Sequence, residues 1–144
     1  MRGSIALEFL LVVLAIAVYI SFTVKSVEVV GLQSAEDISK MVRTRAAMTK
    51  IYNAVQFLAA GADGSSTTVY VYVPTEVNIT LFNNRIHAYV PTEANLARLP
   101  NCDENGCTFE MQTALPFASS YTLSSGVVMP YTFKRQGGKV VKTP

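Results

Sequence analysis

The first 60 residues constrain the fold more than any other part of this chain. The apolar run IALEFLLVVLAIAVYISFTV occupies residues 5–24 and contains one charged residue, Glu8. About 20 apolar residues make a helix long enough to cross the hydrocarbon core of a bilayer. The sequence then continues to residue 60 without a proline, so no such residue forces the helix to break. We expect one continuous helix over residues 4–60.

The two parts of this predicted helix differ in pattern. Residues 4–25 are apolar on every face, which is typical of a helix surrounded by lipid or by other helices. Residues 26–60 are amphipathic, and this pattern predicts a face that packs on a sheet. Gly61 is the expected C-cap. The apolar stripe consists of Val27, Val30, Ser34, Ile38, Met41, Val42, Met48, Tyr52, Val55 and Leu58.

From residue 67 to residue 144 the apolar period changes to two, as in β-strands. Strand-like segments flank Asn83-Asn84 and Gly137-Gly138, which predicts two hairpins. Pro130 lies inside one of these segments and predicts an edge strand or a bulge, because proline has no N–H to donate. The predicted fold class is α+β, with a long N-terminal hydrophobic and amphipathic helix followed by a small antiparallel β-sheet or β-sandwich.

A short internal echo occurs within the β region. YVPTEVNIT begins at Tyr72 and YVPTEANLA begins at Tyr89. The simpler interpretation is two equivalent turns on one edge of a sheet. The alternative is a cation site formed by Glu76, Asn78, Glu93 and Asn95, although calcium needs about 6–8 oxygen ligands and the spacing matches no calcium loop.

Two covalent features are expected if this domain is exported. Cys102 and Cys107 lie in NCDENGC, whose intervening residues favour a turn, so we expect a disulfide. Two cysteines and the distant His87 are too few ligands for a structural zinc site. Asn78-Ile79-Thr80 is a sequon, which makes Asn78 a candidate for N-glycosylation.

The sequence argues against several other functions. The formal net charge is only +2 and the basic residues are scattered, so no nucleic-acid partner is expected. Nucleophile elbows, phosphate-binding glycine loops and histidine-rich metal motifs are absent from the sequence. We therefore expect a protein that is not an enzyme, with no catalytic residue, cofactor or metal.

The segment RGSIALEFLLVV resembles the amino-terminal signature of the type IV pilin superfamily, and most closely the class III signal peptide of archaeal adhesion pilins. That signature has a basic residue, a glycine before the cleavage point, and an apolar helix with glutamate at its fifth position. Arg2, Gly3, Ser4, Glu8 and Phe9 match it. Many archaeal members have glutamine where this chain has Ser4. The β region carries no motif of the family.

The resemblance implies a pilin-like fold and a structural subunit of an extracellular type IV pilus-like filament that serves surface adhesion. Residues 1–3 would be a leader that a prepilin peptidase removes by cutting between Gly3 and Ser4. Glu8, with Phe9 beside it, would be an assembly residue whose carboxylate pairs with the new Ser4 ammonium. The implied partners are identical subunits and a membrane assembly platform. Before assembly the helix would lie in the plasma membrane with its N-terminus in the cytoplasm, as Arg2 indicates.

Three alternatives remain at this point. The chain is a single-span membrane-anchored extracellular β domain if Glu8 merely reaches the interface. A minor pseudopilin of a secretion or tight-adherence system also shows RG followed by Glu-Phe in an apolar run, although an uninterrupted helix of about 55 residues without proline fits a principal filament subunit better. Subunits of the archaeal motility filament usually lack the glutamate, so Glu8 argues against that third class.

Overall fold

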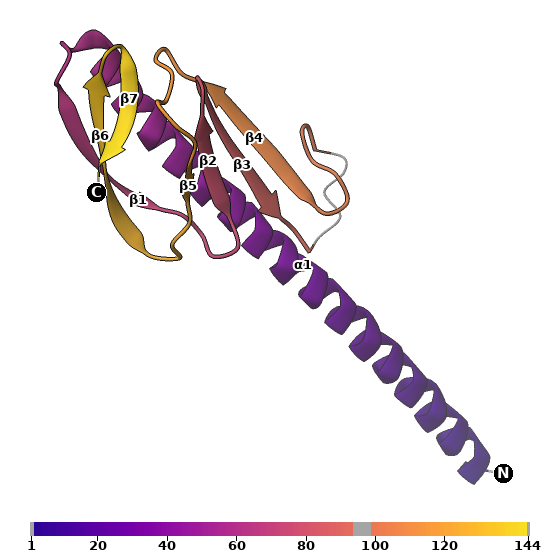
Figure 1. Ribbon diagram of the computed structural model, residues 1–144. Helices are drawn as coiled ribbons and strands as arrows, with labels where there is room; N and C mark the ends of the chain where they lie inside the picture. Colours follow the sequence, from indigo (N-terminus) through magenta and orange to yellow (C-terminus); the bar gives the residue numbers. More distant parts are fainter. Residues whose placement is uncertain (1, 94–98, 144) are drawn as a thin grey trace. The chain divides into compact units, whose positions relative to one another are not determined.

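The computed structural model describes residues 2–93 and 99–143, and within the helix it describes the side chains of residues 12–19 and 34–60 (Figure 1). The chain divides into a first unit that ends at Ala35 and a second unit that begins at Glu36. The elements are α1 (Arg2–Ala60), β1 (Ser66–Tyr72), β2 (Asn78–Phe82), β3 (Arg85–Pro91), β4 (Gly106–Gln112), β5 (Tyr121–Leu123), β6 (Val128–Gln136) and β7 (Lys139–Thr143). The protein is therefore α+β, with a helix followed by antiparallel sheets, as predicted.

The strands form two sheets, one with the order β1-β6-β7 and the other with the order β4-β3-β2-β5. Both predicted hairpins are confirmed, because Phe82 pairs with Arg85 and Gln136 pairs with Lys139. Gly137 and Gly138 both have positive φ angles, which a two-residue hairpin turn requires. The three-residue strand β5 was not anticipated, and it pairs with β2.

Pro130 lies in β6, the central strand of its sheet, although proline has no N–H with which to pair. Its position within β6 explains how it is accommodated. The N–H of Arg135 donates to the carbonyl of Ser65, so odd-numbered residues of β6 direct their backbone groups toward β1. Pro130 therefore points the other way, toward the side of β7. Because β7 pairs only with residues 132–136, the missing N–H of Pro130 faces a free edge.

The second unit has one hydrophobic core, which combines both sheets with one face of α1. Seven of the nine buried helix positions are spaced alternately by four and three residues: Asp37, Met41, Thr44, Met48, Ile51, Val55 and Leu58. Ala47 and Ala54 are buried beside this series. Ile38 and Val42 are instead 50% and 62% exposed, so the predicted stripe was wrong at these two positions. The orientation of the stripe was misjudged because two residues of the buried helix face, Asp37 and Thr44, are polar.

The first unit contributes a segment with a different character. Among residues 12–19, whose side chains are described, the exposed fractions of the large apolar side chains range from 49% at Val13 to 71% at Tyr19. In the part of the chain with described side chains, no helix is both long and apolar enough to cross a membrane. Most of the apolar run at 5–24 lies outside the described side chains, so its predicted membrane role stays a prediction.

Candidate functional site

The two copies of the echo approach the same turn of α1. They end strands of two different sheets, β1 and β3, so the expectation of one shared sheet edge was wrong. Nζ of Lys40 lies 3.7 Å from Oε2 of Glu76, in the first copy. The N–H of Glu93, in the second copy, donates to Oδ2 of the buried Asp37 at 2.9 Å. The echo thus attaches one end of each sheet to residues 37–40.

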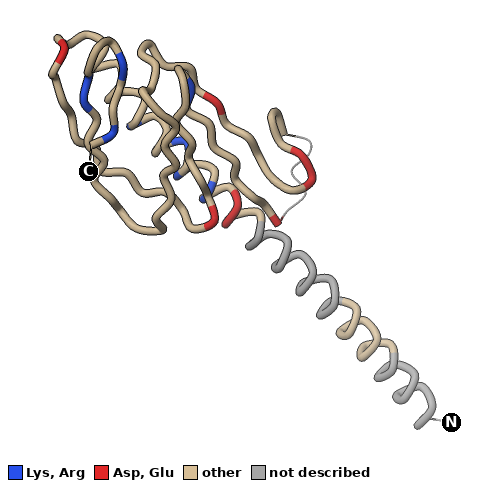
Figure 2. The backbone as a smooth tube through the Cα atoms, viewed as in Figure 1, with Lys and Arg blue, Asp and Glu red and all other residues tan. Residues whose placement is uncertain are grey.

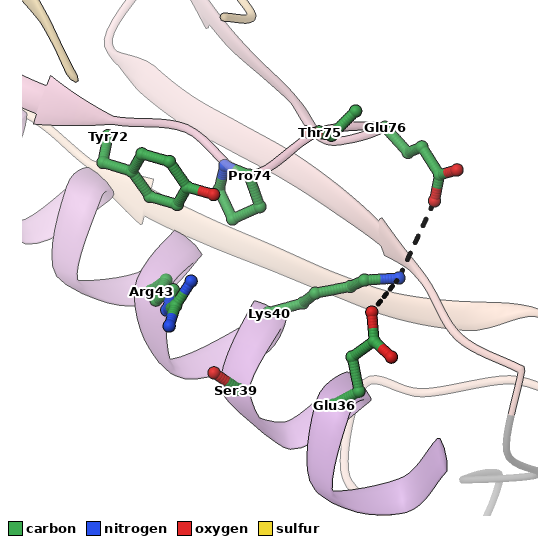
Figure 3. Close-up of a pocket in the computed structure, with 8 residues that line it drawn as sticks. All are labelled: Glu36, Ser39, Lys40, Arg43, Tyr72, Pro74, Thr75 and Glu76. Carbon is green, nitrogen blue, oxygen red and sulfur yellow. Dashed lines mark ion pairs between the residues drawn. The ribbon is translucent and has the colours of Figure 1, made fainter. Parts of the chain in front are cut away.

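The first copy also borders a pocket of about 390 Å³ that is lined by Glu36, Ser39, Lys40, Arg43, Tyr72, Pro74, Thr75 and Glu76. Figure 3 shows Lys40 between the carboxylates of Glu36 and Glu76, at 3.8 Å and 3.7 Å. The guanidinium of Arg43 lies 5.7 Å from the ring centroid of Tyr72. The charges of the two cations and the two carboxylates cancel. The pocket therefore resembles an ion-paired contact between side chains rather than an ion-binding site.

Glu76 has a strained backbone, with φ at 71°. A left-handed conformation costs a residue other than glycine about 1–2 kcal/mol. Its side chain is 67% exposed, so the ion pair with Lys40 contributes at most about 1 kcal/mol. The tight turn, in which the N–H of Val77 donates to the carbonyl of Pro74, is held by the burial of Val73 and Val77 on either side.

The other end of the packed helix is fixed by a single arginine. Nη1 of Arg135 donates to the carbonyls of Gly61 at 2.6 Å and Ala59 at 3.1 Å. Its Nε lies 3.1 Å from Oδ1 of Asp63, which also accepts from the N–H of Gly138. Gly61 follows the helix as expected but does not adopt a positive φ. The end of the helix is therefore capped by an arginine from β6 rather than by a left-handed glycine.

The predicted disulfide between Cys102 and Cys107 is confirmed. Oδ1 of Asp103 shapes the loop between them by accepting from the N–H groups of Asn105 and Gly106, both at 2.8 Å. The carbonyl of Asn105 accepts from the N–H of Thr92, in the second copy of the echo, at 3.0 Å. The disulfide loop is thus connected to the segment that holds Asp37.

The solvent-facing side of α1 in the second unit is unusual because it is uncharged. We define the outer stripe as Ile38, Val42, Ala46, Thr49, Asn53 and Phe57, all exposed. Phe57 and Val42 are 64% and 62% exposed. Charged side chains lie beside the stripe, at positions such as Arg45 and Lys50, and Figure 2 shows the blue and red positions of this part of the chain. A surface helix normally presents charges on this face.

The sequence-predicted assembly residues are not tested by side-chain geometry. Gly3, Ser4, Glu8 and Phe9 belong to α1, but their side chains lie outside the described residues. Asn95 also lies outside them. Of the other members of the alternative cation site, the carboxylate of Glu76 pairs with Lys40, and the backbone N–H of Glu93 donates to Asp37. Across the described residues, no cluster of three or more His, Cys, Asp or Glu side chains could hold a metal.

Sequence reasoning missed Asp37 and Arg135, and the outer stripe. The alternating spacing of four and three residues was a signal for the buried face, provided that Asp37 and Thr44 were accepted as members. No local signal links Arg135 to the end of a helix that lies more than 70 residues earlier.

Comparisons of the chain with protein-family models, with curated proteins and with solved structures found no match.

Proposed function

We propose that this chain is the structural subunit of an extracellular type IV pilus-like filament, assembled through its N-terminal helix and used for surface adhesion. The observation that carries the proposal is the outer stripe, because a helix already packed on its own sheets presents a second face without charges. The exposed apolar side chains of residues 12–19 support the same interpretation. In the proposed filament, neighbouring copies cover both of these exposed surfaces.

Burial of these surfaces between copies supplies the attraction. Fully burying a Val, Ile or Phe side chain contributes about 1.5–3 kcal/mol. Ile38, Val42 and Phe57 are each at least half exposed, so together they offer several kcal/mol before the cost of association is subtracted. A contact between two different surfaces of identical copies generates a helical filament with open ends when its rotation does not close into a ring.

The amino-terminal signature supplies the rest of the proposal. A prepilin peptidase removes residues 1–3, and the carboxylate of Glu8 then pairs with the ammonium of Ser4 on the same or a neighbouring copy. An α-amino group has a pKa of about 8, so it is mostly charged at neutral pH. The pair neutralises a carboxylate that would be costly in an apolar core and sets the axial register.

Microscopy of material sheared from the producing cells tests the proposal. We expect fibres whose main protein has the mass of this chain, and a strong loss of fibres in Val42→Glu. Gln112→Glu is the matched control, because it adds the same charge at an exposed position of β4. Normal fibre yield from Val42→Glu would refute the role of the outer stripe.

A second variant tests the amino-terminal contact. Glu8→Ala should leave membrane insertion unchanged and block assembly, and normal fibres from it would refute the register argument. If the wild-type chain stays in the membrane fraction and forms no fibres, the membrane-anchored β domain becomes the better description.

A further inference from the structure

We infer that Asn78 carries an N-linked oligosaccharide whose first sugar lies in a groove beside the turn at residues 74–78. The inference rests on the proposed function in one respect, because the transfer requires an exported domain. The sequence contains seven asparagines, and only Asn78 is followed at the second position by serine or threonine. The structure adds the exposure, the orientation and the surroundings of this side chain.

Asn78 is exposed at the first residue of β2. It makes no side-chain hydrogen bond to the described part of the chain, so Nδ2 is not occupied there. Ile79 is fully buried, and side chains alternate along a strand. Asn78 and Thr80 therefore both lie on the outward face, which places the acceptor amide and the hydroxyl of the sequon on the same side.

A groove of about 250 Å³ adjoins Asn78, between the turn at residues 74–78 and residues 124–126. Its volume is below the range of about 300–1,000 Å³ for sites that enclose a small ligand. A groove this small suits part of a tethered sugar better than a free molecule. Its rim offers polar partners, namely the side chains of Thr75, Ser124 and Ser125.

Partly exposed Tyr and Val side chains also lie opposite the acceptor or next to the groove residues in the sequence. Tyr89 lies directly opposite Asn78 in the register of β2 and β3 and is 38% exposed. Val127 and Val128 follow the groove residue Gly126 and are 57% and 61% exposed. The apolar face of a sugar ring packs on such side chains, so the glycan would cover surface that is otherwise left in water.

The modification is a group transfer from a lipid-linked oligosaccharide. A bond forms between Nδ2 of Asn78 and C1 of the first sugar, and the bond between C1 and the phosphate oxygen of the lipid carrier breaks. The phosphate leaves with the electron pair of that bond. Nδ2 gives up one proton, which a base of the transferase accepts.

The test is the mass of the tryptic peptide 51–85, which contains Asn78 and is bounded by Lys50 and Arg85. Protein is taken from the producing cells, both from the membrane fraction and from sheared material. The wild type and Thr80→Ser should yield a peptide that is heavier by an oligosaccharide. Asn78→Gln and Thr80→Ala should yield only the unmodified mass.

The outcomes separate this inference from the proposed function. A modified wild-type peptide from cells without fibres supports the glycan and refutes the filament. Fibres whose peptide has the unmodified mass refute the glycan and leave the filament intact. A sugar that persists in Asn78→Gln lies on another residue and overturns the inference. A cooperative urea-unfolding transition of each purified variant confirms that the domain folded.

Discussion

Two stretches of α1 have the same secondary structure for different reasons. Residues 12–19 expose all of their described side chains, whereas residues 37–58 bury nine positions, seven of them at alternating intervals of four and three residues. The second stretch gains its stability from the two sheets of its own chain. Isolated helices are marginal in water, so the first stretch is expected to gain its stability from an apolar environment or from other copies. Continuity of a helix therefore says little about which interactions support it.

The largest expected effect comes from the face that the helix shares with the sheets. Ile51→Ala removes a fully buried side chain and should lower the free energy of unfolding by about 2–5 kcal/mol. Ile16→Ala in the exposed stretch is the matched variant, and it should leave that free energy unchanged within about 0.5 kcal/mol. Urea unfolding followed by tyrosine fluorescence measures both. Equal losses in the free energy of unfolding would show that the domain core stabilises both stretches of the helix alike.

The arginine cap should be the next most important contributor. Arg135→Ala leaves the carbonyls of Ala59 and Gly61 without their charged donor. We expect a loss of about 1.5–3 kcal/mol, the range for hydrogen bonds to charged groups. The neighbouring exposed Lys134 provides the control, and Lys134→Ala should change stability by less than about 0.5 kcal/mol. If the two variants behave alike, the cap does not anchor this end of the packed stretch.

The disulfide should have a moderate effect. It closes a loop of six residues, for which the chain-entropy relation gives about 2 kcal/mol at 25 °C. We therefore expect the double variant Cys102→Ser, Cys107→Ser to lower the free energy of unfolding by about that amount. Hydrogen exchange should also become faster at the N–H groups of Thr92 and Glu93, because the loop and Asp37 hold them. Faster exchange confined to residues 101–107 would show that the loop does not support the helix contact.

The smallest effect on stability should come from the outer stripe. Phe57→Gln changes a side chain that is 64% exposed, so the free energy of unfolding should change by less than about 0.5 kcal/mol. In the proposed filament the same change should reduce fibre yield, because a copy would lose part of its apolar contact. A loss of more than 2 kcal/mol on unfolding would mean that Phe57 supports the domain itself. Normal fibre yield would mean that the contact between copies depends on the other residues of the outer stripe.

Local signals in the sequence predicted the elements better than their contacts. The end of the helix at Ala60, both hairpins and the disulfide depend on short stretches of turn-forming residues, and these predictions were confirmed. The orientation of the helix was misjudged at Ile38 and Val42, because polarity alone assigns Asp37 to the surface although Glu93 binds it in the interior. The division into two sheets and the cap by Arg135 depend on contacts between distant segments.

Pro130 has a consequence for how the domain behaves at high concentration. An unpaired strand edge offers a row of donors and acceptors to any other chain that passes, which is the usual start of aggregation. At residues 128–131 the side of β6 that faces away from β1 is such an edge, because β7 pairs only with residues 132–136, and Pro130 removes a donor from it. Many copies of this domain can therefore be kept close together, as the proposed filament requires, with less risk that their sheets join.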